Sequence, residues 1–244
     1  VPDYYNGILP KVVAKVGEKV KAGSVLMIDK NRPEIKFVSP VSGEVTAVNR
    51  GEKRKVLSIV VKPDAQIEYE EFGKKNVASL QGAEVKEVLL NAGMWPFIKQ
   101  RPYDIVAAPL DTPRDIFVSA FYSAPLAPNF DFIVKGQEAD FQTGLNALAK
   151  LTNGKVYVGV RSGSVVSGMK GVEIVEVEGP HPAANVGVQI NHIKPVNKGE
   201  VVWTVNPADV IVIGRLFNKG VADFSRMVAI TGSETTERGY VKTI

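Results

Sequence analysis

The amino-acid sequence predicts an α/β protein in two parts: a β-only module over residues 1–70 and an open α/β domain over residues 71–244. Up to Lys62, short apolar segments alternate with glycine and proline turns, a pattern typical of small β-barrels. From Ser79 onward, strand-like and helix-like segments alternate, as they do in an open α/β layer. The change of pattern places the boundary between Pro63 and Ser79.

The composition is that of an ordinary globular chain of 244 residues, 45% hydrophobic and 23% charged. The sequence has no cysteine, which excludes disulfides, iron–sulfur clusters ligated by this chain, cysteine-ligated zinc and a thiol nucleophile. No apolar run reaches the roughly 20 residues that a membrane-spanning helix needs. The net charge is only +4 and no base-reading motif occurs, so we expect no nucleic-acid partner.

The N-terminal part reads as two similar halves, each a strand, a turn and a strand. The first is "KVGEKVKAGSVL", whose turns contain Gly17 and Gly23, and the second is "VSPVSGEVTAV", whose turn contains Pro40 and Gly43. The strand "KVLSIVV" closes the set. This internal repeat predicts a flattened barrel-sandwich module of the biotinyl/lipoyl type.

Lys30 occupies the place where such a module could carry a swinging arm. It follows the apolar segment "VLMID", as does the lysine that carries lipoate or biotin. The connection "NRPE" is long and broken by proline, however, and the Met-Lys-Met of biotinyl domains is absent. We therefore expect Lys30 to be exposed at a hairpin tip and unmodified, with a lipoyl or biotinyl carrier as an alternative function.

The elements of the second part follow from hydrophobic period and end signals. Helical spacing predicts helices over 83–93, 138–152 and 206–220, and apolar runs predict strands over 103–110, 114–121, 155–160, 171–179 and 226–231. Asn206 is placed to cap the last helix, with Pro207 at its first position and Gly220 past its end. Strands alternating with helices predict a Rossmann-like architecture.

Two glycine-rich or basic segments are candidates for anion binding. "GVRSGSVVSGMKG" resembles a phosphate loop, but Met169 takes the lysine position and a strand follows instead of a helix, so we interpret it as a mobile surface loop. No G-x-G-x-x-G fingerprint occurs. "NRGEKRK" indicates a solvated hairpin turn, with a docking face for an anionic partner or lipid headgroup as the alternative.

The two histidines differ in their surroundings. His192 alternates with Val188 and Ile190 and is interpreted as a structural strand residue. His181 lies in "GPHPAANVG", where Pro180 and Pro182 stiffen the backbone on either side. This turn has either a purely architectural role or a contact role. No pattern indicates a catalytic residue or a metal site.

Several segments together resemble a known family. They are "VGEKVKAGSVLMIDKNRPEIKFVSPVSGEVTAVNRGEKRKVLSIVV", "NAGMWPFIKQRPYD", "DFQTGLNALAKLTNGKVYV", "GPHPA" and "DVIVIGRLF". Over nearly its whole length the chain resembles the NqrA family, the A subunits of the Na⁺-translocating NADH:quinone reductase. The resemblance implies a peripheral subunit on the cytoplasmic face of the bacterial inner membrane. It also implies that residues precede Val1, and that a β-grasp module and a helical segment follow Ile244.

The resemblance further implies a role in an enzyme complex that passes electrons from NADH to quinone and expels Na⁺. Its partners would be quinone and the other subunits, chiefly the membrane-embedded quinone-reductase subunit. NADH, flavins, iron–sulfur clusters and quinone would be used on those subunits, and the isolated chain would be inactive. We expect this chain to contribute to quinone access and complex assembly, with His181, Pro180, Pro182 and Ala183 as a contact surface for quinone or a partner.

The layout is also similar to the flavin- and NADH-binding subunit of the proton-pumping NADH dehydrogenase and to a ferredoxin-oxidising relative. There a glycine-rich loop lets backbone amides approach the flavin phosphate. Here the corresponding stretch is "GMWPFIKQRP", where Trp95, Phe97 and Ile98 are expected to fill the flavin space. An expected acidic turn is replaced by "YSAPLAP", with Ser123 and Ala124. We expect no cofactor on this chain, and a flavin- and NADH-binding module is the alternative.

Overall fold

The N-terminal module consists of two three-stranded antiparallel sheets that face each other. The structure, a computed structural model, describes residues 2–244. The elements of this part are η1 (Pro2–Tyr4), β1 (Pro10–Val12), β2 (Lys19–Val20), β3 (Val25–Asp29), β4 (Lys36–Val38), β5 (Gly43–Arg50), η2 (Glu52–Arg54) and β6 (Val56–Pro63). The sheet orders are β1-β3-β4 and β2-β5-β6. Val20, Leu26 and Val45 pack between the sheets, which confirms a barrel-sandwich module.

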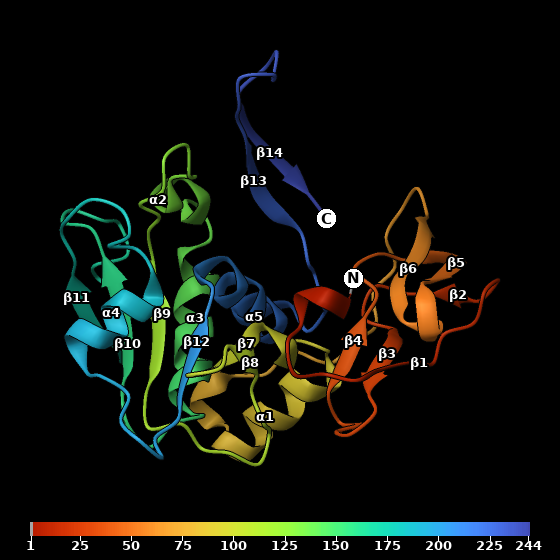
Figure 1. Cartoon of the computed structure of the whole chain (residues 1–244), viewed down its shortest axis with the longest axis horizontal. Coiled ribbons are helices and arrows are strands. Elements are labelled where there is room, and N and C mark those ends of the chain that lie inside the picture. Colours follow the sequence, from red (N-terminus) through yellow and green to blue (C-terminus); the bar gives the residue numbers. More distant parts are fainter. Residues whose placement is uncertain (1) are drawn as a thin grey trace.

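The second part is an open sheet of six strands (Figure 1). Its elements are η3 (Val77–Ser79), α1 (Gly82–Asn91), η4 (Trp95–Phe97), β7 (Ile98–Arg101), β8 (Ile105–Val106), β9 (Ile116–Ser119), α2 (Phe130–Val134), α3 (Glu138–Ala149), β10 (Val156–Val160), β11 (Glu173–Glu176), α4 (Val186–Ile193), β12 (Val202–Val205) and α5 (Pro207–Lys219). The strand order is β11-β10-β9-β12-β7-β8. The first four are mutually parallel, β7 is antiparallel to β12, and β8 is antiparallel to β7.

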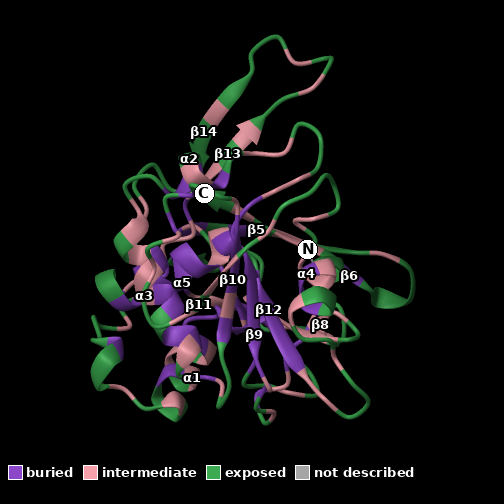
Figure 2. Cartoon of the chain, turned by 90° about the vertical axis from the view of Figure 1, so that its left-hand side faces the viewer, coloured by how far each residue is buried: buried purple, intermediate pink, exposed green. Residues whose placement is uncertain are grey.

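Helices cover both faces of this sheet. Consecutive residues of a strand point to opposite faces, so each strand has side chains that pack against helices on both sides. On β9, Ile116 and Val118 belong to the core shared with α3 and α5, whereas Phe117 packs with Ile190 of α4. The central strands and α5 are the most buried elements, as Figure 2 shows. Side chains on the same face of β9 as Phe117, such as that of Ser119, therefore lie on the side of the sheet that α4 covers.

The N-terminal module and the α/β domain share one apolar core. Ile35 and Phe37 of the module belong to the same buried cluster as Leu89 of α1 and Trp95 of η4. Within the module, Tyr5 packs edge-to-face on Phe37, with ring centroids 4.8 Å apart. The two parts are thus fixed to each other by side-chain packing.

The chain ends in a hairpin of β13 (Arg226–Ile230) and β14 (Gly239–Thr243) that projects from the body (Figure 1). Its inner face is anchored at Tyr240, whose ring lies 4.3 Å from that of Phe132 and whose hydroxyl accepts a hydrogen bond from the Asn129 N–H at 2.7 Å. Its outer face leaves Ile230 and other apolar side chains exposed.

Most predicted elements are present, with bounds that differ by a few residues. The end signals of α5 are confirmed: the Asn206 side chain accepts from the Ala208 N–H, and Gly220 has a φ of 77°. Gly93, which follows α1, has a φ of 67°. The strand predicted over 103–110 is confirmed only at Ile105–Val106, where β8 forms the sheet edge. The helix α2, the strands β7, β12 and β14 and the short helices η1 to η4 were not predicted.

The prediction that His192 lies in a strand is wrong. His192 is an exposed residue near the end of α4, and only Ile190 among the apolar residues of that helix is fully buried. Val186, Ile190 and Ile193 face Phe117 and Val202 of the sheet. Their spacing of four and three residues places them on one face of a helix. Packing of this face against the sheet therefore favours a helix over the strand that the alternating pattern predicted.

Candidate functional site

A cleft of about 570 Å³ opens at the carboxyl ends of β9 and β12, which are neighbours in the sheet. From β9 the chain continues to β10 and β11 on one side, whereas β12 lies on the other side, so the strand order reverses between β9 and β12. In open α/β sheets, ligands bind in the crevice at this reversal, outside the carboxyl ends of the strands. The cleft therefore has the position of a ligand site.

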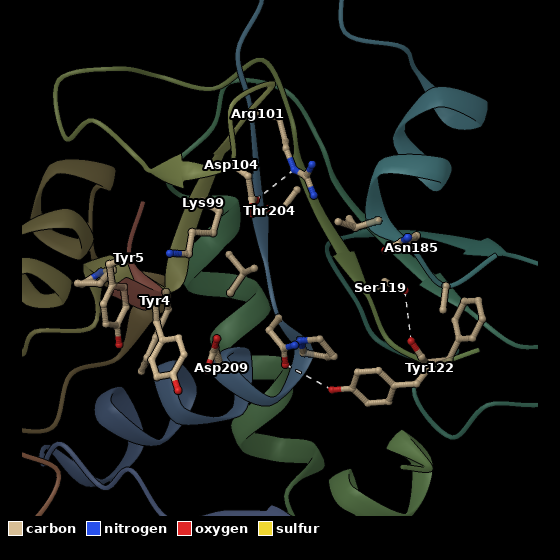
Figure 3. A pocket seen from close by; sticks show the side chains of 18 of the residues that line it. Tyr4, Tyr5, Lys99, Arg101, Asp104, Ser119, Tyr122, Asn185, Thr204 and Asp209 are labelled. Carbon is tan, nitrogen blue, oxygen red and sulfur yellow. Dashed lines mark hydrogen bonds and ion pairs between the residues drawn. The ribbon is translucent and has the colours of Figure 1, made fainter. Parts of the chain in front are cut away.

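Side chains from distant parts of the sequence meet in this cleft. Figure 3 shows Tyr5 and Lys99 facing Ser119 and Tyr122 across it, with Asp209 between them. The complete lining is Tyr4, Tyr5, Pro96, Phe97, Lys99, Arg101, Asp104, Ser119, Phe121, Tyr122, Ala184, Asn185, Val186, Thr204, Val205, Asn206, Pro207, Asp209 and Arg226. Aromatic rings and hydrogen-bond donors make up much of this surface.

The cleft contains three cations and two carboxylates. Arg226 pairs with Asp209 at 2.7 Å, and Arg101 Nε lies 3.4 Å from Asp104 Oδ1. Burial raises the pKa of the Asp209 carboxyl, although Arg226 and Lys99 oppose this shift. Lys99 is the remaining cation: it forms no ion pair with a described residue, and its Nζ lies 4.8 Å from the centre of the Tyr5 ring. Burial lowers the pKa of the Lys99 ammonium, and Asp104 and Asp209 partly offset that effect.

Neutral donors lie opposite Lys99. The Tyr122 hydroxyl donates a 3.4 Å hydrogen bond to Asn206 Oδ1, and burial raises the pKa of Tyr122, which keeps the hydroxyl protonated. Ser119 Oγ accepts a hydrogen bond from Gln189 Nε2 at 2.9 Å. The Ser119 hydroxyl proton is therefore free to point toward the Phe121 carbonyl, 3.4 Å away, or toward a ligand. A flat ligand with oxygen acceptors at both ends matches donors on the two walls.

The turn predicted as a contact surface stands at the rim of the cleft. Residues Pro180, His181, Pro182 and Ala183 do not line the cleft themselves, but the next two residues, Ala184 and Asn185, do. Pro180, His181 and Pro182 are exposed. The turn leads from β11 into α4, so it does not join two strands. Whether it contacts quinone or a partner stays a prediction.

Ser123 holds this turn in place. Ser123 Oγ and His181 Nδ1 form a 3.2 Å hydrogen bond, and the same oxygen accepts from the Ala184 N–H at 3.0 Å. Ser123 therefore has a definite role where the resemblance led us to expect an acidic turn. The segments "YSAPLAP" and "GPHPAANVG", which are separate in the sequence, therefore meet at the rim of the cleft.

Lys30 is exposed at the connection between β3 and β4, as expected. The connection is fastened by Arg32, which donates to Asp29 Oδ2 at 2.8 Å, to the Gly7 carbonyl at 2.9 Å and to the Val106 carbonyl at 3.3 Å. Val106 belongs to β8, so this hairpin is attached to the α/β domain. That Lys30 is unmodified stays a prediction.

The stretch expected to fill the flavin space divides between the core and the cleft. Trp95 is fully buried, donates from Nε1 to the Ala107 carbonyl at 2.8 Å and packs edge-to-face on Trp203 at 5.4 Å. Ile98 is also buried, whereas Phe97 is half-buried and lines the cleft. The stretch offers no row of glycine amides for a flavin phosphate, so a flavin does not fit it by that motif.

The two anion-binding candidates are both surface turns. The loop over 161–171 leads into β11 and not into a helix, as predicted. The turn around η2 joins β5 to β6, and its residues from Glu52 to Lys55 are exposed. Lys55 pairs with Asp3 at 2.9 Å. The hairpin-turn interpretation is confirmed.

Within residues 2–244, no three or more histidine, aspartate or glutamate side chains converge as metal ligands would. Over the same described residues, none of the helices has both the length and the apolar character that crossing a bilayer requires.

Sequence reasoning missed most residues of the cleft. Lys99 lies on β7, a short strand whose mixed residues "IKQR" show no clear period. Tyr122 directly follows a predicted strand, and Asp209 lies in the first turn of a predicted helix, so both positions could have been noticed. Without β12 as a predicted strand, however, nothing placed these ends at one edge of the sheet.

The comparisons with known proteins agree with this architecture. The family model "NqrA N-terminal barrel-sandwich hybrid domain" matches residues 1–64, and "NqrA second alpha/beta domain" matches residues 80–222. A relative from Hahella chejuensis, named as the A subunit of a Na(+)-translocating NADH-quinone reductase, is 38% identical over 98% of this chain and 54% of its own length. Relatives of the same name from Neisseria meningitidis serogroup A and Photorhabdus laumondii are 37% and 36% identical over 98% of this chain, and over 55% and 54% of their own lengths.

This chain spans about half the length of the curated relatives that it matches. The two family models together match residues 1–64 and 80–222, and the relatives align over 98% of the chain. The chain therefore belongs to the NqrA family, the A subunits of the Na⁺-translocating NADH-quinone reductase.

Proposed function

We propose that this chain contributes to quinone access and assembly in a Na⁺-translocating NADH:quinone reductase and carries no redox cofactor of its own. The names of the relatives suggest the complex. The single observation that carries the quinone assignment is the cleft at the reversal of strand order, where aromatic walls surround donors on opposite sides.

The chemistry of a quinone suits these walls. A quinone is a flat ring with two carbonyl acceptors, and it carries no charge. Lys99 forms no ion pair with any of the residues 2–244, so it is available to donate to one carbonyl. The Tyr122 hydroxyl faces it from the other wall, and its one proton can turn from the long 3.4 Å contact with Asn206 to the second carbonyl. Rings such as Phe97 and Tyr5 can stack on the ligand.

The remaining parts of the proposal extend what the names of the relatives suggest. We place the chain at the cytoplasmic face of the bacterial inner membrane, with NADH, flavins and iron–sulfur centres on other subunits. Its partners would be those subunits, chiefly the membrane-embedded quinone-reductase subunit. The turn of Pro180, His181, Pro182 and Ala183 supports this role, because an exposed and stiff surface loses little conformational entropy when a partner binds.

Replacing Lys99 tests the quinone assignment. Lys99→Met removes the donor but keeps an unbranched side chain, and we expect the Kd of the full-length protein for a short-chain benzoquinone to rise about tenfold to hundredfold. Lys155→Met is the control, because Lys155 is an exposed lysine before β10, at the opposite end of the sheet. Equal Kd values for wild type and Lys99→Met, measured by calorimetric titration, would rule the cleft out as the quinone site.

The position of the cleft also favours a second candidate, a flavin- and NADH-binding module. Dinucleotides and flavins bind at the same crevice in related folds. The lack of a glycine cradle speaks against it, because bulky side chains keep phosphate away from backbone amides. Titration of the full-length protein with FMN should show no binding at micromolar concentration, whereas stoichiometric binding would favour this candidate.

A further inference from the structure

A second hollow, of about 480 Å³, lies between the N-terminal module and the rest of the chain. Its walls are mainly apolar: Leu26, Met27, Phe37 and Ile59 come from the module, and Phe224 and Ile244 come from the C-terminal side. We call it the apolar groove. Its volume and that of the cleft both fall in the range of about 300–1,000 Å³ that is typical of ligand pockets.

The cleft and the apolar groove are neighbours that share walls. Tyr5, Pro96, Phe97 and Arg226 line both of them. Tyr5 packs on Phe37 on the groove side at 4.8 Å and lies under the Lys99 ammonium on the cleft side at 4.8 Å.

Phe97 likewise has contacts toward both hollows. Its ring centroid lies 6.2 Å from that of Phe224, which lines the groove, and 5.3 Å from the Arg226 guanidinium. Tyr5 and Phe97 therefore form an aromatic ridge with a polar hollow on one side and an apolar hollow on the other.

We propose that the cleft and the apolar groove together form one site for an amphiphilic quinone, whose ring lies in the cleft and whose isoprenoid tail crosses the ridge into the groove. This inference rests on the proposed function. The donors and charges are concentrated in the cleft, so the ring belongs there. The groove offers hydrocarbon on most of its walls, and a tail is the part of such a ligand that gains from leaving water.

Both sides of the groove must contribute if a tail binds there. Ile59 is half-buried on β6, and Ile244, which directly follows β14, is 51% exposed. Each therefore has surface that a tail could cover. Leu57 on β6 and Ile230 on β13 come from the same two elements or their hairpin, are 40% and 42% exposed and do not line the groove, so they serve as controls.

Tail length is the variable that tests the site. The probes are 2,3-dimethoxy-5-methyl-1,4-benzoquinone and its homologues with one, two and four isoprene units, titrated into the full-length protein at one fixed detergent concentration. We expect the Kd to fall about tenfold for each unit that enters the groove and then to level off. Ile59→Asn and Ile244→Asn should reduce this gain and leave the Kd of the tail-less ring unchanged, whereas Leu57→Asn and Ile230→Asn should change neither.

The outcomes separate this inference from the proposed function. If no homologue binds, the proposed function fails and the tail site with it. If all homologues bind with one Kd, or if the groove variants keep the full gain in affinity with tail length, the ring site stands and the tail site is wrong. The groove would then have another occupant, such as a protein segment. Circular dichroism checks the fold of each variant, and Ile244→Asn provides the second test if Ile59→Asn does not fold.

Discussion

At the scale of residues, the cleft combines paired charges with a lysine that has no carboxylate partner in the described part of the chain. The two arginines are neutralised by Asp104 and Asp209, and Lys99 is left to face the open space. A half-buried ammonium without a carboxylate is costly unless a ligand or water satisfies it. This is why a single lysine, and not the larger number of aromatic residues, defines where an acceptor would bind.

The protonation of Lys99 should appear in the pH dependence of quinone binding. Burial lowers its pKa from the usual range near about 10.4, with Asp104 and Asp209 opposing and the arginines at 101 and 226 close by. The charged donor is present below the lowered pKa and is lost as pH rises through it, so affinity should decline at a lower pH than for a free lysine. Lys99→Arg keeps a charge over the same range and should remove the decline. If the affinity of Lys99→Arg still declines over the same pH range, a group other than Lys99 causes the decline.

His181 offers a second test at this scale. His181→Ala removes the hydrogen bond to Ser123 from an exposed turn, so the free energy of unfolding should fall by less than about 1 kcal/mol. We expect quinone reduction or assembly of the whole complex to be impaired, because the turn borders the cleft. Ser123→Ala is the companion variant, since it also frees the Ala184 N–H. Wild-type reduction and assembly in His181→Ala would leave the residue with an architectural role only.

At the scale of elements, the sheet depends on the close approach of α3 and α5. A Cβ added at Gly214 would overlap the carbonyl oxygen of Asp140, and one at Gly144 would overlap that of Val210. The two helices thus cross where each has no side chain. This contact determines the position of α5, whose N-cap Asn206 and first-turn residue Asp209 line the cleft.

Gly214→Ala should therefore be destabilising. The added methyl has to push two backbones apart, which we expect to lower the free energy of unfolding by about 1–3 kcal/mol. Gly187→Ala is the control: Gly187 lies in α4, and the nearest atom to its added Cβ is 3.9 Å away, so helix propensity alone should make that variant neutral or slightly more stable. Urea denaturation of both variants provides the comparison. Equal stability of the two would show that the crossing relaxes freely.

At the scale of the whole molecule, the shared core makes the two parts one mechanical unit. Ile35 and Phe37 of the N-terminal module are buried with Leu89 and Trp95 of the α/β domain, and Arg32 bonds across the junction. The same junction produces the apolar groove. The relative placement of cleft and groove is thus a property of the junction and not of either part alone.

Thermal unfolding should reflect this junction. We expect calorimetry to show one transition for residues 1–244, because separating the parts would expose shared apolar side chains. Ile35→Ala should lower that single Tm, with a cost of about 2–5 kcal/mol for a fully buried isoleucine. Two transitions, of which Ile35→Ala shifts only the earlier one, would mean that the parts unfold independently.

Local patterns in the sequence were sufficient to predict the main elements and both architectural parts. The caps of α5, the glycine after α1 and the turns of the barrel-sandwich module are short-range signals, so they can be read without the fold. The same holds for the exposure of Lys30 at a connection between strands. The helical nature of α4 could not be read, because its apolar residues fit two periods until Phe117 and Val202 selected one.

Only the tertiary structure decided the site. Lys99, Tyr122 and Asp209 come from three elements, and they meet because the strand order reverses between β9 and β12. Strand order depends on long-range pairing, which leaves no trace in the local period of a sequence. The pairing of Ser123 with His181 has the same origin, since 58 residues separate them. Chain segments determine what can be a helix or a strand, whereas their packing determines which side chains share a cleft.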